Sequence, residues 1–480
     1  MKHYKRGCIL LILLLISQLA TPRDALNLPD FGDASSLMIS PQEEQRLGQL
    51  FLSSYRGQMP TSSDPLLLDY INSLLANLAQ HSQLINRNLH LVVVESPVMN
   101  AFAAPGNIVG VNTGLLVHSQ SETQLVSVLS HELAHLSQRH YARRLEQQKN
   151  MQLPMVAALL ASLALLATDG GDGGIAALTA SQALAADAQL RFSRHFEQEA
   201  DRLGMDIMIN AGYDPYGAAE MFEQMLRASR FYRRPPEFLL THPVTESRVA
   251  DARNRAQRFD RRLREDNVEY HLMRNRIRFD QAGTSAEAIS MFSGEIAGKS
   301  LSVDASRYGL ALAYSEAGRI EEARNTLAPL LANDPERITY KIMDIDIDIR
   351  ARDYDSALAK LQSARRYRPN NYPLNVRYAE TLMASGRHQT ATDFLSQYVR
   401  ERPNDPHLWY LLAEVSGLAG NILQVHEARA EYFILLGSYS MAITQLRHAL
   451  KLSTDSFHRT ALLTERLRHV EELQIEIRNL

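Results

Sequence analysis

The sequence predicts an α+β protein that is mostly helical, in which a mixed N-terminal domain is followed by an α-solenoid. Two observations carry this prediction. Amphipathic helical segments surround one short strand-like segment near residue 90, and the C-terminal half repeats with a fixed period. Because 480 residues exceed one small core, we expect separate domains at 26–270 and 271–480.

The composition fits a globular protein. Hydrophobic residues make up 45% of the chain and charged residues 22%, which excludes a disordered chain. The formal net charge is −3. Neither a basic groove nor an acidic tail is indicated, so we expect no nucleic-acid partner.

The first 25 residues have the pattern of an export signal. Lys2, Lys5 and Arg6 precede an unbroken apolar run from Ile9 to Ile16, which is short for a membrane span. An uncleaved anchor is the alternative. The only cysteine is Cys8, so the chain left after cleavage tolerates an oxidising compartment without disulfides, and any metal ligands must be His, Asp or Glu.

The elements of the first domain follow from capping and periodicity. Helices are expected to begin at Ser40-Pro41 and at Asp64-Pro65, where a capping residue precedes a proline. The segment from Leu89 to Val94 predicts a buried strand.

A turn and an edge strand are expected next. Gly106 and Asn107 suit a hairpin-like turn. Pro105 favours an edge strand over a central one. The residues Asn100, Ala101, Phe102 and Ala103 are therefore candidates to bind an extended substrate along an exposed edge, and an ordinary edge strand is the alternative.

A long helix carries the strongest chemical signal. Ser119 and Glu122 are expected to form its capping box. His131 and His135 lie four residues apart, so both imidazoles can reach one ion from the same helical face. Glu132 projects near the same place and can accept a proton from metal-bound water. Zinc suits such ligands and makes bound water nucleophilic near neutral pH.

The histidine pair needs a third ligand. Glu197 and Asp201 share a helical face. Glu197 is the candidate ligand, and Asp201 is the candidate to hold a ligand histidine through its second ring nitrogen. Glu199 is expected to point elsewhere. A solvated acidic first turn is the alternative for this segment.

Residues 155–167 are strongly apolar and are followed by a glycine-rich stretch. Thirteen residues are too short to span a bilayer easily. A buried core helix is one interpretation. A mobile lid, or a contact with the membrane surface, is the other.

The C-terminal part repeats every 34 residues. This period and its small-residue and proline positions resemble a tetratricopeptide array of helix pairs. Alanine permits close helix packing, and proline ends the second helix. The period blurs after Pro403, and the segment from Ser440 looks like another second helix that is displaced, which favours a distorted or capped end. Three aromatic residues are expected in the core, with exposed anchors as the alternative: Tyr340, Tyr372 and Tyr378. The repeating columns are Ala323, Ala357 and Ala391, then Leu327, Leu361 and Leu395, then Pro335, Pro369 and Pro403.

The histidine motif and the later acidic pair together resemble the M48 family of zinc metallopeptidases. The segment Asn100-Ala-Phe-Ala-Ala-Pro-Gly and the segment Thr241-His-Pro-Val-Thr-Glu-Ser-Arg248 resemble further parts of that family. The resemblance covers about 40–260 and implies a zincin-like domain. It also implies Glu197 as third ligand, Glu132 as base and Asp201 as orienting residue.

Two residues near 242 have open roles. His242 precedes a proline and is expected either to stabilise the oxyanion or to occupy the open position of the zinc. Arg248 is a second candidate to stabilise developing negative charge. His118 and His140 fall outside the ligand spacing and are expected to be structural.

These features together predict a zinc metalloendopeptidase with one Zn²⁺ per chain. The resemblance implies a periplasmic location, peripheral to the outer membrane. It implies unfolded, misassembled or stalled outer-membrane proteins as substrates, help with their assembly, and contact with the barrel-assembly machinery. A periplasmic chaperone or adaptor, in which the repeats dominate, is the alternative, and a non-proteolytic zinc hydrolase is a third. Glu132 argues against a pure binding module, which needs no base beside the metal.

Overall fold

The computed structural model describes residues 40–147, 193–231, 238, 242–261 and 267–478. The predicted export signal and the apolar segment 155–167 lie outside these residues. The described chain is mostly helical with one small sheet, which confirms the predicted class. No helix in these ranges combines the length and the apolar character that crossing a bilayer requires.

The first two helices begin where the sequence predicted. Helix α2 (Pro41–Gln58) is capped by Ser40 as expected, and Ser40 also forms a capping box with Glu43. In α3 (Pro65–Gln80), the Asp64 carboxylate accepts the N–H groups of Leu66 and Leu67.

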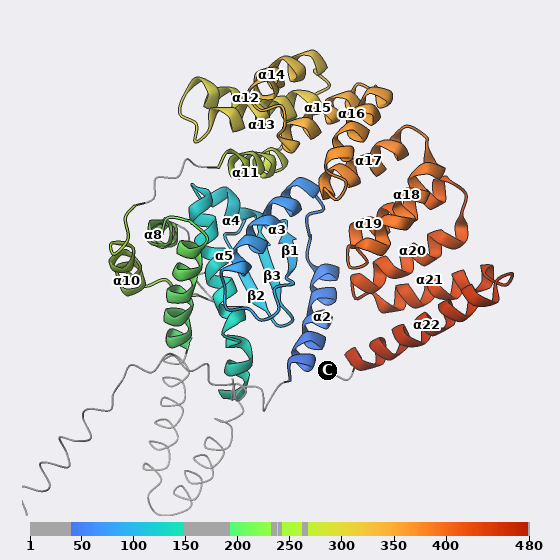
Figure 1. The fold of residues 1–480 in the computed structure, drawn as a ribbon, viewed down its shortest axis with the longest axis horizontal. Coiled ribbons are helices and arrows are strands. Elements are labelled where there is room, and N and C mark those ends of the chain that lie inside the picture. The colour runs from blue at the N-terminus through green and yellow to red at the C-terminus, as the bar shows by residue number, and fades with distance from the viewer. Residues whose placement is uncertain (1–39, 148–192, 232–237, 239–241, 262–266, 479–480) are drawn as a thin grey trace, which may run out of the picture.

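A three-stranded sheet packs beside these helices (Figure 1). Its strands are β1 (His90–Val94), β2 (Ala101–Ala104) and β3 (Ile108–Asn112), in the order β1-β3-β2. β1 is parallel to β3 and β2 is antiparallel to it. β2 is thus an edge strand, as Pro105 predicted. The predicted turn is present, with φ of 77° at Gly106 and 61° at Asn107.

The long helix is α5 (Glu122–Ser137), which follows α4 (Thr113–His118). The predicted capping box is wrong. Ser121, not Ser119, caps α5 by accepting the N–H of Gln124. Ser119 instead ends α4 and donates its hydroxyl to Leu115, while the Glu122 carboxylate accepts the Tyr70 hydroxyl.

A helix over residues 193–210 crosses α5 closely. A Cβ built on Gly204 would lie 3.0 Å from the backbone nitrogen of His131, so a glycine permits this approach. Three further helices, over residues 140–147, α8 (Tyr216–Phe231) and α10 (Glu246–Ala256), complete the described part of this domain.

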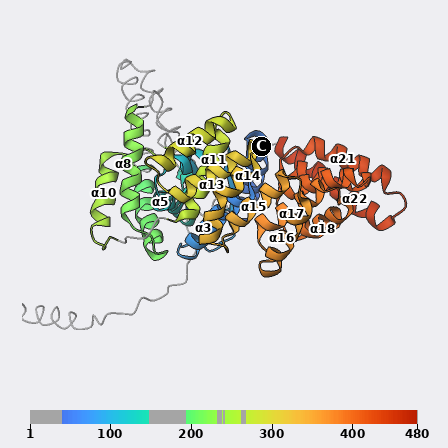
Figure 2. The same ribbon diagram turned by 90° about the horizontal axis from the view of Figure 1, so that it is seen from above.

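The C-terminal helices stack into a curved array (Figures 1 and 2). The alanine and leucine columns of the 34-residue period are buried, as predicted. A further column appears at the turn inside each pair, where residues 318, 352, 386 and 420 all have positive φ. The helices are α11 (Val268–Gln281), α12 (Ser285–Ala297), α13 (Val303–Glu316), α14 (Ile320–Asn333), α15 (Ile338–Arg350), α16 (Tyr354–Tyr367), α17 (Tyr372–Ala384), α18 (His388–Glu401), α19 (Pro406–Leu418), α20 (Ile422–Leu435), α21 (Tyr439–Leu452) and α22 (Phe457–Arg478).

The period continues beyond Pro403, which corrects the sequence interpretation. α20 begins 34 residues after α18 (422 against 388), so it is the second helix of its pair, and α21 is the first helix of the next. The alanine column disguised this because its next position holds Val425. Tyr340 and Tyr372 are buried and Tyr378 is partly buried, which confirms the expected core role.

The array contacts the first domain at both ends. At its start, α11 crosses the expected boundary at residue 270, and the Tyr270 hydroxyl donates to the carbonyls of Leu116 and Ser119. At its far end, a Cβ built on Gly57 of α2 would collide with the carbonyl of Leu436. Both views place the C-terminal helices beside α2 (Figures 1 and 2).

Candidate metal centre

Helix α5 presents His131, Glu132 and His135 toward one buried point. The i, i+4 spacing brings the two imidazoles together edge to face, and their Nε2 atoms lie 3.0 Å apart. His131 is 3% exposed and Glu132 is 1% exposed, so burial separates this chemistry from bulk water.

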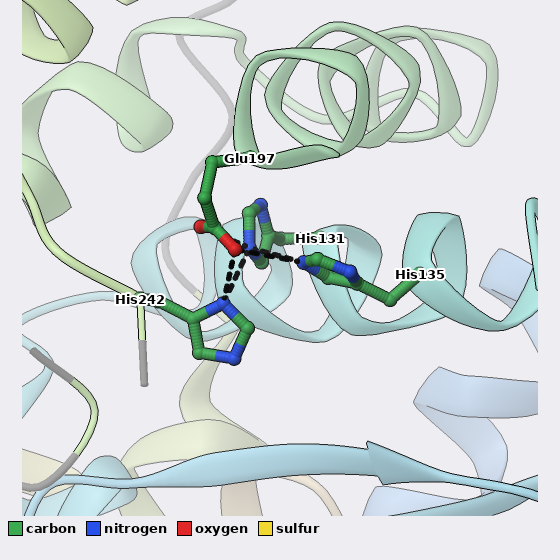
Figure 3. A group of neighbouring side chains, drawn as sticks. All are labelled: His131, His135, Glu197 and His242. Atoms are coloured by element: carbon green, nitrogen blue, oxygen red, sulfur yellow. Dashed lines mark hydrogen bonds and ion pairs between the residues drawn. The ribbon is translucent and has the colours of Figure 1, made fainter. Parts of the chain in front are cut away.

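The helix 193–210 and a loop supply the other two groups (Figure 3). Glu197 Oε2 lies 3.5 Å from His131 Nε2, and Glu197 Oε1 lies 3.5 Å from His135 Nε2. His242 Nδ1 lies 2.9 Å from Glu197 Oε1 and 3.4 Å from His131 Nε2. One donor atom from each of these four residues falls within 4.8 Å of the others.

These separations suit one shared metal ion. Bonds of about 2.05 Å to nitrogen or oxygen place neighbouring ligand atoms about 3.3 Å apart in a tetrahedron. Five donor separations, from 2.9 to 3.5 Å, lie near that figure, and the four donor atoms as a set fall within 4.8 Å of one another. Three imidazoles and one carboxylate are also the ligand types that zinc accepts.

Asp201 and Arg248 support the group from behind. Asp201 Oδ1 lies 3.0 Å from His131 Nδ1, the nitrogen that faces away from the other donor atoms. Arg248 donates to both oxygens of Asp201 at 2.6 and 2.7 Å. Burial alone raises the pKa of Asp201, but hydrogen bonds from His131 and Arg248 lower it below its ordinary value.

The Arg248 guanidinium is already paired with carboxylates in this structure. Its Nη1 lies 3.0 Å from Glu197 Oε2 and donates to the carbonyl of Pro243 at 2.8 Å. The same guanidinium therefore joins Asp201, Glu197 and the loop that carries His242. This geometry gives it a positioning role in the resting site.

Glu132 sits beside the four-residue group. Its Oε1 lies 3.7 Å from His242 Nε2, and burial raises its pKa despite the nearby histidines. The backbone N–H of Ala103 on β2 hydrogen-bonds to its carboxylate. The edge strand that the sequence proposed for substrate thus borders the candidate base.

The four predicted edge residues differ in their surroundings. Ala101 is buried, and the carbonyl of Asn100 accepts the Asn112 N–H. Phe102 is partly buried, with its ring centroid 5.2 Å from that of Tyr55. Among the residues described, no strand pairs with the outer side of β2.

Sequence reasoning missed a second supporting chain, through His140 and Glu199. His140 Nδ1 lies 2.8 Å from His135 Nδ1, and its Nε2 lies 3.2 Å from Glu199 Oε2. Arg143 donates to the same oxygen at 3.1 Å. Glu199 and His140 thus stay outside the four-residue donor group, but both support His135 from behind, a role that the sequence analysis did not propose.

A backbone reversal explains why spacing did not reveal His140. Arg139 adopts a φ of 48°, which ends α5 and turns the next helical residues back toward His135. Phe238, also missed, stacks on His242 with centroids 4.8 Å apart. His118 ends α4 outside this group, and its carbonyl accepts the Gln224 side chain.

The fold and this site define a metallopeptidase that carries helical repeats. The model of "Peptidase family M48" matches residues 65–256, and the model "Tetratricopeptide repeat" matches residues 348–415. The chain is thus a metalloendopeptidase with a C-terminal repeat array.

The similar proteins identify a more specific family within the metallopeptidases. The "Beta-barrel assembly-enhancing protease" of Escherichia coli (strain K12) is 34% identical over 450 residues, which cover 93% of this chain and 92% of the relative. The Vibrio cholerae protein called "Putative beta-barrel assembly-enhancing protease" is 32% identical over 88% of this chain and 87% of its own length. "Mitochondrial metalloendopeptidase OMA1" of Schizosaccharomyces pombe is 31% identical over 41% of this chain and 55% of the relative. This chain belongs to the family of β-barrel assembly-enhancing proteases.

Proposed function

We propose that this chain is a periplasmic zinc metalloendopeptidase that hydrolyses misfolded or stalled outer-membrane proteins and assists the assembly of others. The observation that carries the enzymatic part is the cluster of four donor atoms, within 4.8 Å of one another, beside the buried Glu132. The location and substrate class rest on the export-signal pattern and on the names of the full-length relatives.

His131, His135 and Glu197 would hold one Zn²⁺. The ion, when bound, lowers the pKa of a water molecule and polarises the scissile carbonyl. Glu132 takes the proton from that water and delivers it to the leaving amine. Asp201 fixes the ring of His131. The outer edge of β2, from Asn100 to Ala103, aligns the substrate backbone.

We further propose that His242 closes the resting site. Its Nδ1 occupies the fourth corner of the group, and its Nε2 faces Glu132, so a nucleophilic water has no place beside the base. This favours capping over the oxyanion role. While the site is capped, only the repeat array can act on a client protein. A chaperone or adaptor function is therefore the second candidate.

The division of labour stays a proposal. The domain at 26–270 cuts, and the array at 271–480 selects substrates and contacts the barrel-assembly machinery. Because α11 crosses residue 270, the full-length chain is the form in which this should be tested.

The test combines metal analysis with cleavage. Purified full-length chain should contain about one zinc. Its Glu132→Gln variant should keep that zinc, lose cleavage of an unfolded outer-membrane protein, and still bind it. Zinc-free wild-type protein that cleaves at the same rate as the loaded protein contradicts the proposal.

A further inference from the structure

A groove separates the first domain from the array, on the side away from the metal centre. It consists of two adjoining cavities of about 730 and 710 Å³. The first lies between α2 and α20–α22, and the second lies between β1 and the helices α17 and α19. Arg56, His90 and Asn404 line both cavities and mark where they join.

The floor of the second cavity contains an open strand edge. The N–H of His90 bonds toward β3, through Asn107, whereas Val93 accepts the Ser62 N–H on the opposite side. Strand alternation therefore points the N–H and C=O of Leu91 into the groove. Neither group has a backbone partner among the residues described, because the chain turns into α3 after Ser62.

Arg56 supplies an unsatisfied cation at the junction. Its one hydrogen bond in the described structure goes to the Asn404 carbonyl at 3.4 Å, and no carboxylate pairs with it there. Burial lowers the pKa of Arg56, with Asp405 opposing. The Asp405 carboxylate is already used, since it accepts the His407 and Leu408 N–H groups at the start of α19.

The residues around Arg56 favour an anionic group that is part of a polypeptide. Burial and the charge of Arg56 lower the pKa of His90, which favours its neutral imidazole and leaves Arg56 as the cation that an anion would meet there. Tyr410, 45% exposed, and Tyr432 line the second cavity with ring centroids 5.7 Å apart. Aromatic rings of this kind provide apolar contact for side chains next to a polar anchor.

We propose that this groove binds the C-terminal end of an extended polypeptide, with its terminal carboxylate on Arg56 and its backbone added to β1 at Leu91. The occupant is a polypeptide end rather than a free anion because the strand edge, the tyrosines and the cation line one continuous groove. β1 and β2 are the two opposite edges of the same sheet. A client held by its end at β1 is therefore bound apart from the edge beside Glu132.

The test measures binding of one peptide in two forms. A fluorescent, unstructured ten-residue peptide without acidic side chains is titrated against full-length Glu132→Gln protein, once with a free C-terminal carboxylate and once amidated. The free form should bind roughly 10- to 100-fold tighter, the range for a charge-assisted hydrogen bond. Arg56→Gln should reduce its affinity to that of the amide.

Arg46→Gln is the matched control. Arg46 lies on the same helix and lines the first cavity, but it pairs with Glu476 at 2.6 Å, so its removal should change affinity less than about 2-fold. Hydrogen exchange supplies a measurement that needs no variant: the segment containing Leu91 should become protected when the free peptide binds.

Three results would overturn the proposal. Equal affinity for the two peptides, unchanged by Arg56→Gln, removes the carboxylate site. Full competition by millimolar inorganic phosphate without protection at Leu91 indicates a simple anion site. Concentration-dependent dimerisation that Arg56→Gln abolishes assigns the groove to a second copy of the chain.

Discussion

Replacement of His242 by alanine tests how the resting site is kept closed. The imidazole hydrogen-bonds to Glu197 at 2.9 Å and stacks on Phe238. A hydrogen bond to a charged group contributes about 1.5–3 kcal/mol, and an aromatic stack about 0.5–1.5 kcal/mol. Without an ion, the closed arrangement is thus favoured by about 2–4.5 kcal/mol, and roughly one molecule in 30 to one in 2,000 is open; with zinc, a bond from Nδ1 to the ion would replace the hydrogen bond to Glu197.

His242→Ala should therefore increase cleavage of an unfolded protein at least about 30-fold. The assay compares initial rates of zinc-loaded wild type and variant, with zinc content measured in both. His242→Ala combined with Glu132→Gln is the control and should be inactive. A rate that falls 10-fold or more while zinc is retained would show that His242 acts in the transition state instead. An unchanged rate would refute both roles.

Three further predictions follow from the contacts of the site and of the array. Glu132→Gln should retain zinc by metal analysis and lose about 10²- to 10⁴-fold in cleavage rate, because an amide cannot accept the proton; wild-type cleavage would exclude it as the base. His140→Phe should weaken zinc binding about 10- to 100-fold in a chelator competition, since the stack on Phe196 is kept but the contact to His135 is lost; unchanged affinity would make His140 purely structural. Gly57→Val should destabilise the chain by about 1–3 kcal/mol in urea unfolding and expose α20–α22 to protease, because its side chain collides with Leu436. Gly294→Ala is the control for that change, since a Cβ there meets nothing within 4 Å.

Local pattern predicted the parts of the structure that local forces determine. The caps at Ser40 and Asp64, the turn at Gly106 and the 34-residue period all depend on residues close in sequence. The convergence of His131 and His135 follows from helical geometry alone. The approach of Glu197 to them depends on the helix crossing at Gly204; its spacing from Asp201 made it a candidate ligand, and the family resemblance favoured it over the solvated alternative.

Long-range packing determined what the sequence did not reveal. The contact of His140 with His135 depends on a positive φ at Arg139, which a non-glycine residue rarely adopts. The place of α21 within its helix pair was predicted wrongly. The prediction relied on the alanine column, which is interrupted at Val425, whereas the helices continue to stack with the same period. The docking of α2 against the last helices involves residues almost 400 positions apart, such as Ser53 and Tyr439, whose hydroxyls lie 3.2 Å apart with a separation of 386 residues.

The double attachment of the array has a consequence for how the chain unfolds. Free repeat arrays behave as chains of nearest-neighbour units, so their terminal repeats melt first and stability is spread unevenly along them. Here the first helix packs under α4 and the last pairs are fastened to α2, so neither terminus can fray on its own. Because the array contacts the first domain at both ends, its repeats are expected to unfold together with that domain. We therefore expect the described part of the chain to unfold as a single cooperative unit, with the array keeping its curvature until its contacts with the first domain are lost.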